Sequence, residues 1–341
     1  MSDLTRRFSN GSSDVATRFD VVGIGNALVD VIAPAEDHFL ERHDLVKGAM
    51  TLIETERAVE LYAALERAVE MSGGSAANTV VGVASLGGRA AYIGKVNGDD
   101  LGDVFGHDMR AVGVTFHRPP GEHGTPTGRC VIVVTPDAER TMNTYLGVSS
   151  ELCVDDLDEQ VVADSHVLYM EGYLFDRDDA KAAFRRAAEV AHENGRMVSL
   201  TLSDSFCVDR HRDDFRALVQ DRVDLLFGTH DELLSLYQLD SFDDAVAALR
   251  DECEFAAITV GADGCVIVTP DELLRVPAMP VERVNDTTGA GDLFAAGFLH
   301  GLTTGRDLET CGRYGAVAAA EVIGHVGPRP LVELRNLIVD G

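Results

Sequence analysis

Apolar runs and amphipathic stretches alternate along the second half of the chain in a rhythm typical of α/β proteins. Short apolar runs fit buried strands at residues 167–170, 197–202, 225–227 and 256–260. Stretches with helical spacing of apolar residues lie between them, at residues 178–193, 213–219, 231–237 and 242–249. Because strands that alternate with helices usually pair in parallel through crossover connections, this half predicts an α/β sandwich.

The first half of the chain adds short β segments to this rhythm. Strands are predicted at residues 21–24, 27–33 and 90–93, and helices at 58–69 and 75–86. A hairpin is predicted from residues 131–134 and 141–145. The β-rich segments at about 27–54 and 115–146 interrupt the βα units, which predicts a small β-sheet lid inserted in two places. Such a lid could close over a ligand and exclude water. Paired strands near Gly264 and helices from Gly289 onward complete the chain.

The composition limits the class of partner and the cellular compartment. Lys and Arg number 29 against 57 Asp and Glu, which gives the 341-residue chain a formal net charge of −28. Nucleic acids and anionic membranes need a basic patch, so they are excluded as main partners. No apolar stretch reaches about 18 residues, and the six cysteines form no C-x-x-C pair. We therefore expect a cytoplasmic protein with a flexible tail at residues 1–18 and one α/β domain at 19–335.

A segment near the C-terminus has the features of an anion hole at the start of a helix. The sequence D-T-T-G-A-G-D, from Asp286 to Asp292, leads from polar residues through two glycines into an apolar stretch. Gly289, Ala290 and Gly291 have little or no side chain, so their N–H groups can approach a phosphoryl group closely. The carboxylate of Asp292 would repel such a guest, a cost that makes sense if Asp292 takes the proton from an attacking hydroxyl. The alternative is that Asp292 only caps the helix.

Two motifs together resemble the signatures of the ribokinase-like (PfkB) carbohydrate kinase family. D-T-T-G-A-G-D is similar to the C-terminal signature, and G-G-S-A-A-N at 73–78 with I-G-K-V-N-G-D at 93–99 is similar to the N-terminal one. The resemblance covers about residues 20–332. It implies a ribokinase-like three-layer α/β/α sandwich, with a mostly parallel central sheet and a small β-sheet lid. It also implies an ATP-dependent kinase that uses Mg²⁺ and, in many members, K⁺.

The resemblance assigns the phosphoryl-transfer residues. Asp292 matches the family's catalytic base, Gly289–Gly291 match its anion hole, and Asp286 matches a residue that helps to hold a monovalent cation.

The same resemblance places the ATP contacts. Thr259, Gly261 and Gly264 match a loop that touches ATP. The family's Mg²⁺-linked N-x-x-E motif falls at residues 229–232, with Thr229 in place of Asn. Glu232 is retained, and it is expected to reach Mg²⁺ through water. The alternative is that Glu232 only starts a helix.

The acceptor site is expected around Asn26 and Asp30, two polar residues inside apolar surroundings. Burial of polar groups costs free energy, so a function is expected for this pair. Amide and carboxylate groups suit vicinal hydroxyls. The surrounding residues 23–30 are similar to those of adenosine kinases, where the corresponding pair faces the ribose. Gly73 and Gly74 belong to the same acceptor signature, and Asn78 matches a further ribose contact.

Two more residues are weaker acceptor candidates. Tyr173 could stack on a purine, or it could only pack in the core. Arg140 matches a lid arginine that meets the phosphate, or it could belong to a solvated hairpin.

The function implied is ATP-dependent phosphorylation of a primary hydroxyl, with the 5′-hydroxyl of adenosine as the first choice. A sugar kinase acting on ribose, fructose or a relative is the alternative within the class. A non-catalytic nucleotide or sugar sensor is the second class, and a structural or nucleic-acid-binding role is the third. Whether the protein is a monomer or a homodimer stays open.

Overall fold

The computed structural model describes residues 17–117, 124–137 and 139–338. Of the tail predicted at residues 1–18, only Thr17 and Arg18 lie within these ranges. Thr17 is buried, and the backbone N–H of Arg18 donates to the carbonyl of Asp164 at 2.8 Å. These two residues therefore belong to the folded body and not to a tail.

A nine-stranded sheet forms the centre of the body, in the order β14-β13-β12-β11-β10-β9-β1-β5-β6. Neighbouring strands from β6 to β12 pair in parallel, whereas β12-β13 and β13-β14 pair antiparallel. The strands are β1 (Phe19–Ile24), β5 (Ala90–Ile93), β6 (Thr115–Phe116), β9 (Ser165–Glu171), β10 (Met197–Thr201), β11 (Leu225–Thr229), β12 (Phe255–Thr259), β13 (Cys265–Val268) and β14 (Leu273–Val276).

Helices cover both faces of this sheet, because its strands are apolar on both sides. Val21 of β1 belongs to one buried cluster and the next residue, Val22, belongs to another. Helices α4 (Ser75–Ser85), α5 (Asp100–Ala111), α11 (Ala290–Thr303) and α12 (Leu308–Ile323) close the first cluster. Helices α6 (Glu159–Ala163), α7 (Asp178–Glu193), α8 (Ser205–Arg222), α9 (His230–Tyr237) and α10 (Phe242–Arg250) close the second. The predicted three-layer sandwich with a mostly parallel sheet is confirmed.

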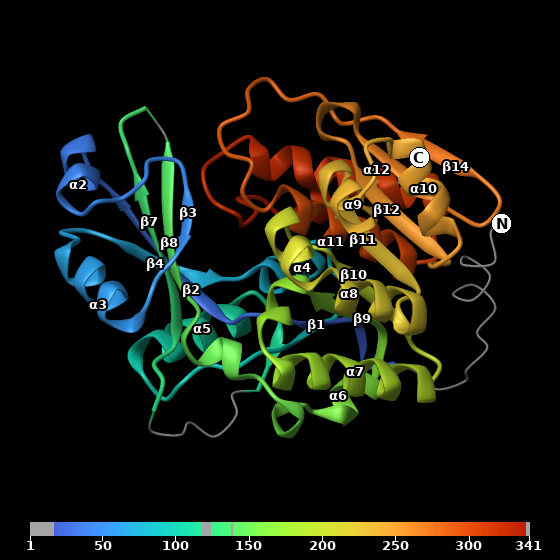
Figure 1. The fold of residues 1–341 in the computed structure, drawn as a ribbon, viewed down its shortest axis with the longest axis horizontal. Coiled ribbons are helices and arrows are strands. Elements are labelled where there is room, and N and C mark those ends of the chain that lie inside the picture. Colours follow the sequence, from blue (N-terminus) through green and yellow to red (C-terminus); the bar gives the residue numbers. More distant parts are fainter. Residues whose placement is uncertain (1–16, 118–123, 138, 339–341) are drawn as a thin grey trace.

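A second, five-stranded sheet forms a separate lobe, at the left of Figure 1, in the order β3-β8-β7-β2-β4. Its strands are β2 (Leu28–Pro34), β3 (Met50–Leu52), β4 (Val69–Gly73), β7 (Gly128–Val134) and β8 (Arg140–Tyr145), with α2 (Asp37–Arg42) and α3 (Thr55–Ala64) alongside. Helix α3 ends at Ala64, so the helix predicted at 58–69 is too long. β4 follows it and lies outside both segments predicted for the lid. Residues 115–116 were expected in the lid, but as β6 they pair with β5 of the large sheet.

The two lobes meet where several parallel strands end. The carboxyl ends of β1, β9, β10, β11 and β12 point to the same edge of the large sheet, and ligands of open α/β sheets bind at such an edge. Helices α4 and α11 begin there, and the small sheet stands over it.

All six cysteines lie in the described ranges, and each is a free thiol. Across residues 17–117, 124–137 and 139–338, no helix combines the length and the apolar character needed to cross a bilayer.

Candidate active site

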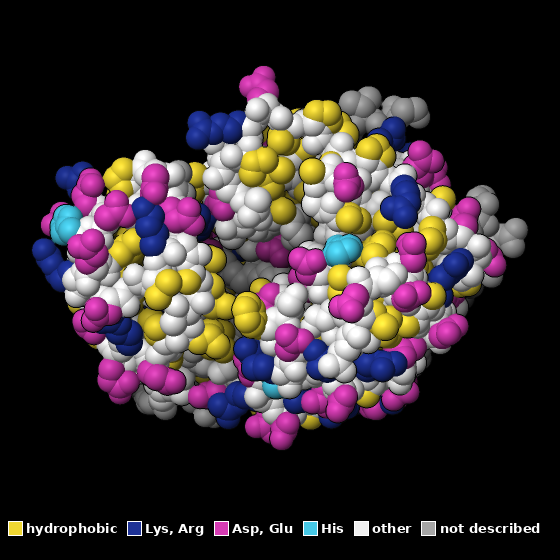
Figure 2. Space-filling model, turned by 45° about the horizontal axis from the view of Figure 1, so that its top comes forward, with side chains coloured by type: hydrophobic (Ala, Val, Ile, Leu, Met, Phe, Trp, Pro, Cys, Tyr) yellow, Lys and Arg dark blue, Asp and Glu magenta, His cyan; other side chains and the backbone are white. Residues whose placement is uncertain are grey.

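A cavity of about 790 Å³ opens between the small sheet and the large sheet. Figure 2 shows the surface hollowed between the two lobes, with apolar side chains around the rim. Eleven of the residues predicted from the sequence line this cavity: Asn26, Asp30, Gly74, Asn78, Tyr173, Glu232, Thr259, Gly289, Ala290, Gly291 and Asp292. The remaining five, Gly73, Arg140, Gly261, Gly264 and Asp286, do not line it.

Asp292 lies in the first turn of α11, and two side chains of α4 hold its carboxylate. Ser75 Oγ donates to Oδ1 at 2.6 Å, and Asn78 Nδ2 donates to Oδ2 at 2.8 Å. Burial raises the pKa of Asp292 to about 6, although both hydrogen bonds work in the opposite direction. A carboxylate with a pKa in this range is ionised at neutral pH and accepts a proton more readily than an exposed one.

The start of α11 presents backbone donors to the same cavity. Gly289, at the N-cap, has a φ of +80° and turns the chain into the helix. The N–H of Ala290 donates to the Thr287 carbonyl, whereas those of Gly291 and Asp292 have no acceptor among the described residues. These two N–H groups stand beside the Asp292 carboxylate, at the positive end of the helix dipole. The geometry suits an anion hole next to a base.

Asn26 and Asp30 line the cavity from the turn after β1 and from β2. Asn26 Nδ2 donates to Glu171 Oε1 at 3.1 Å, and its Oδ1 accepts from Ser149 Oγ at 3.0 Å. Asp30 packs directly over Gly73, where a Cβ would lie 2.6 Å from the carboxylate. Burial raises the pKa of Asp30 to about 6.

Gly74 makes the turn from β4 into α4 possible. Its φ is +100°, and a Cβ there would lie 2.1 Å from the carbonyl oxygen of Asn26. This close approach places Ser75 and Asn78 of α4 within reach of Asp292.

Sequence reasoning missed two ionisable residues at this site, Glu171 and Arg329. Glu171 ends β9, lines the cavity and accepts three hydrogen bonds, two from Asn26 and one from the N–H of Ala76 at 2.8 Å. Burial raises the pKa of Glu171 to about 7. The guanidinium of Arg329 donates to the carbonyl oxygens of Ser72 and Ala77. An acidic residue directly after the apolar run 167–170 was a usable signal for Glu171, whereas no local pattern marks Arg329.

Arg140 and Asp286 form a buried ion pair between the small sheet and the loop that precedes α11. The interpretation of Arg140 as part of a solvated hairpin is therefore wrong. Asp286 also accepts from Thr288 N–H and Oγ and from Gly327 N–H, at 2.9, 2.7 and 2.8 Å. Four donors therefore contact its two oxygens, and its expected role beside a monovalent cation stays a prediction.

The residues predicted to contact ATP separate into two groups. Thr259 and Glu232 line the cavity, whereas Gly261 and Gly264 do not. Gly264 has a φ of +94°, and a Cβ there would lie 2.1 Å from the Val276 carbonyl oxygen, so a tight turn requires glycine at this position.

Thr229 and Glu232 form a capping box at the start of α9. Glu232 Oε2 accepts from Thr229 N–H at 3.0 Å, and Thr229 Oγ accepts from Glu232 N–H at 3.2 Å. The helix-start interpretation of Glu232 is thus correct, yet its carboxylate also lines the cavity, and burial raises its pKa to about 6.

Tyr173 lies on the cavity wall and also packs against the core beneath α7 and α8, so both interpretations of this residue describe part of its surroundings. Its hydroxyl donates to the Ser203 carbonyl at 3.2 Å.

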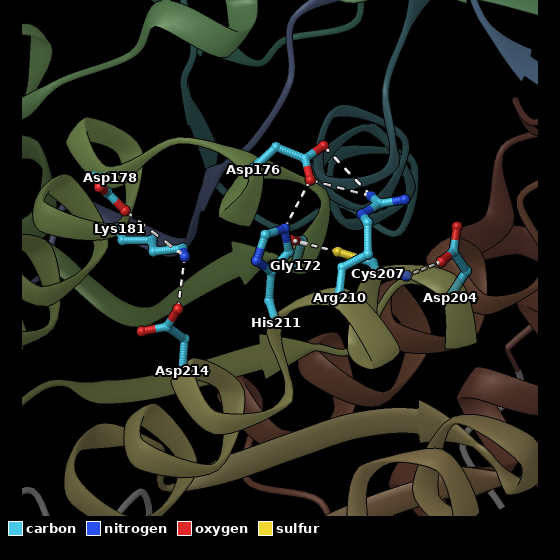
Figure 3. A network of polar contacts seen from close by, with 9 residues as sticks. All are labelled: Gly172, Asp176, Asp178, Lys181, Asp204, Cys207, Arg210, His211 and Asp214. Carbon is cyan, nitrogen blue, oxygen red and sulfur yellow. Dashed lines mark hydrogen bonds and ion pairs between the residues drawn. The ribbon is translucent and has the colours of Figure 1, made fainter.

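A polar network, shown in Figure 3, fixes the neighbouring part of the rim. Asp176 accepts from Arg210 at 3.1 Å and contacts His211 at 2.8 Å, which ties the segment after β9 to α8. Helix α8 begins at Ser205, eight residues before the predicted start, and it is kinked at His211. Asp204 caps it by accepting from Cys207 N–H at 2.6 Å.

Comparison with known proteins supports the same interpretation. The model of the pfkB family carbohydrate kinases matches residues 20–334. The solved structure of adenosine kinase from Sinorhizobium meliloti is 52% identical, has a TM-score of 0.87, and covers 94% of this chain and 98% of that one. A probable sugar kinase protein from Rhizobium etli CFN 42 is 50% identical, with the same TM-score and coverage. Adenosine kinase 1 from Arabidopsis thaliana is 27% identical over 335 residues, which is 90% of this chain and 94% of the relative.

The family match spans nearly the whole described chain, and the solved structures share its layered architecture with a second small sheet. The ribokinase-like fold expected from the two motifs is therefore confirmed. The chain belongs to the pfkB family of carbohydrate kinases, and it is a kinase whose acceptor is a nucleoside or a sugar.

Proposed function

We propose that this protein transfers the γ-phosphoryl group of ATP to the 5′-hydroxyl of adenosine, with Asp292 as the general base. The observation that carries the proposal is the position of the Asp292 carboxylate. It lies in the cavity at the first turn of α11, beside two N–H groups without acceptors among the described residues, and α4 holds both of its oxygens.

The proposed chemistry needs chiefly positioning and electrostatics. Asp292 accepts the proton as the hydroxyl oxygen attacks the γ-phosphorus, and the bond from phosphorus to the bridging oxygen of ADP breaks. The N–H groups of Gly291 and Asp292 stabilise charge that develops on the transferred group. Asn26 and Asp30 bind the ribose hydroxyls and hold the acceptor in line.

Mg²⁺ would neutralise charge on the phosphates of ATP. Glu232 suits an ion held through water, since its buried carboxylate lines the cavity and only Oε2 has a hydrogen-bond partner within the described residues. Thr259 lines the same end of the cavity and is assigned to ATP. Arg140 is not part of the cavity lining, but it interacts with Asp30, which is. We assign it to the transferred phosphate, because its Nε and Nη2 are buried without a partner in the described part of the chain.

Two observations favour a nucleoside over a simple sugar. Tyr173 and the exposed Phe206 also line the cavity, and they offer aromatic surface to a base. The 52% identical relative from Sinorhizobium meliloti is an adenosine kinase. The 50% identical probable sugar kinase keeps a sugar as the second candidate acceptor.

The test is phosphorylation by the purified protein with ATP and Mg²⁺, using adenosine, ribose and fructose as separate acceptors. We expect adenosine to have the highest kcat/KM. Asp292→Asn should bind ATP and lose at least about 10²-fold in kcat, whereas Asp178→Asn, at a fully exposed carboxylate, should keep wild-type activity. Asn26→Ala and Asp30→Ala should raise KM for the acceptor more than for ATP.

Turnover of a sugar without turnover of adenosine would reject the nucleoside assignment. Near-wild-type activity of Asp292→Asn would reject the assigned base. A larger rise in KM for ATP than for the acceptor in the Asn26 and Asp30 variants would mean that the two ends of the cavity are interchanged.

A further inference from the structure

A three-residue segment after α12, Gly327–Arg329, contacts three parts of the site at once. The N–H of Gly327 donates to Asp286 Oδ2 at 2.8 Å. Pro328 lies against Gly289, so close that a Cβ on that glycine would be 2.8 Å from the Pro328 Cα. Arg329 reaches in the other direction, to the turn that joins β4 to α4.

Arg329 holds both ends of that turn. Its Nη2 donates to the carbonyl oxygen of Ser72 at 2.8 Å and to Ser72 Oγ at 3.1 Å, and its Nε donates to the same carbonyl at 3.2 Å. Its Nη1 donates to the carbonyl oxygen of Ala77 at 3.0 Å. Between these contacts lies Ser75, which donates to Asp292, and directly after them comes Asn78, the second donor. The guanidinium thus fixes the segment that orients the proposed base.

Arg329 also carries positive charge into a strongly acidic region. Asp30, Asp292 and Asp108 all interact favourably with it. Burial lowers the pKa of Arg329 to about 10, so the guanidinium stays charged at neutral pH. The charge of Arg329 in turn lowers the pKa values of Asp30 and Asp292. Without it, burial would raise both pKa values further.

We propose that Arg329 is a positioning residue of the kinase reaction, which clamps the Ser72–Ala77 turn and keeps Asp292 and Asp30 ionised in the cavity. The inference rests on the proposed function, in which Asp292 acts as the base. Through Arg329, the segment Gly327–Arg329 would then influence the pKa values of Asp30 and Asp292.

Other ionisable groups also contribute to the electrostatic surroundings of Asp30, Asp292 and Arg329. Those that interact with Asp292, Asp30 or Arg329 are Glu171 and Tyr169 of β9, Tyr173 after β9, Tyr92 of β5, Asp108 of α5, Cys130 of β7 and Arg140 of β8. Besides Arg329, Arg140 is the only cation of this set, and its ion-pair partner is Asp286. Loss of Arg329 therefore leaves the two cavity carboxylates with mainly acidic neighbours.

The test compares the pH profile of kcat/KM in Arg329→Lys and Arg329→Met, in which the new side chains have similar lengths. Lysine keeps the charge, and methionine removes both the charge and the hydrogen bonds. Arg335→Met is the control, because Arg335 is exposed in the same C-terminal segment and pairs only with Glu333 among the described residues. If Arg329→Met is recovered unfolded, Arg329→Gln replaces it as the neutral variant.

We expect the acidic limb of the profile to move up by about one pH unit in Arg329→Met, the scale of one lost nearby charge. It should stay near its wild-type position in Arg329→Lys and Arg335→Met. A neutral variant with reduced kcat but an unmoved acidic limb would overturn the proposal, since that result describes a purely structural role. An equal shift in Arg329→Lys would also overturn it, because the charge would then be irrelevant.

A second measurement does not depend on activity. Asp292 and Asp30 have folded-state pKa values of about 6, above the ordinary value of 3.8. The folded state therefore binds their protons more tightly, and their contribution to stability is lost as the pH rises from about 4 through 6. In Arg329→Met this loss should continue to a higher pH than in Arg329→Lys, as measured by urea unfolding. If the wild-type protein phosphorylates no acceptor, the proposed function is rejected. Separately, the role of Arg329 is rejected if the unfolding free energies of Arg329→Met and Arg329→Lys have the same pH dependence.

Discussion

Replacement of Gly289 by alanine is the most direct perturbation of the proposed anion hole, because it combines two separate penalties. Gly289 has a φ of +80°, a region that costs an L-residue about 1 kcal/mol. A Cβ at this position would also lie 2.8–3.0 Å from three atoms of Pro328, two of them backbone atoms. Relief of such an overlap in a packed region typically costs about 1–3 kcal/mol. The expected loss of unfolding free energy is therefore about 2–4 kcal/mol.

Gly113 provides a matched control for the backbone penalty alone. Its φ is +84°, and a Cβ there would have no atom within 4 Å. Gly113→Ala should thus lose only about 1 kcal/mol, and the difference between the two variants measures the clash with Pro328. Urea denaturation followed by circular dichroism gives both free energies.

The clash should also affect catalysis. Either Pro328 or the first turn of α11 must move, and the N–H groups of Gly291 and Asp292 move with that turn. Loss of one well-placed donor to a developing negative charge costs about 10²-fold or more in kcat, so Gly289→Ala should lose activity on this scale at a temperature where it is folded. Gly113→Ala should keep its activity, since neither Gly113 nor any residue of α5 lines the cavity. Equal stability and activity of the two variants would refute the reasoning about Pro328.

Two further predictions concern buried charges. Burial raises the pKa of Glu171 to about 7 from 4.5, so its contribution to stability is present at low pH and is lost as the pH rises through 7. The unfolding free energy of the wild type relative to Glu171→Gln should therefore fall by about 2.5 kcal/mol between about pH 5 and pH 8, and a rise would contradict the assigned burial. Arg140→Met and Asp286→Asn should each lower the free energy of unfolding by about 3 kcal/mol or more, because each leaves a buried charged or polar partner uncompensated. The double variant should lose clearly less than the sum of the two, as measured by urea unfolding. Additive losses would show that the pair is not coupled.

The layered fold could be predicted because buried parallel strands appear in the sequence as continuous apolar runs. Helix α7 occupies residues 178–193, as predicted, since its apolar residues recur at helical spacing and an acidic pair begins it. Strand β4 could not be predicted in this way. Its sequence, V-E-M-S-G, contains few apolar residues, and it is exposed at its start. Among the described strands it pairs only with β2. An edge strand of this kind lacks the hydrophobic pattern on which the prediction depends.

The site residues likewise divide into those that a local sequence pattern marks and those that it does not. Asp292 and its glycines lie in one contiguous motif, so chemistry and spacing were enough to find them. Glu171 acts on Asn26 across 145 residues, and Arg329 acts on Ser72 across 257 residues. No local pattern can record partners that only the folded topology brings together.

The small sheet is built by two separate excursions of the chain, which has a practical consequence for protein engineering. The first excursion supplies β2, β3 and β4, the second supplies β7 and β8, and the contact between them is the parallel pairing of β2 with β7 and of β3 with β8. Exchange of this sheet between relatives therefore requires four splice points, and a graft of either excursion alone leaves unmatched strands. The first two splice points fall beside Asn26 and Gly74, so a chimaera made to alter the cover of the cavity would also cut through residues proposed to bind the acceptor.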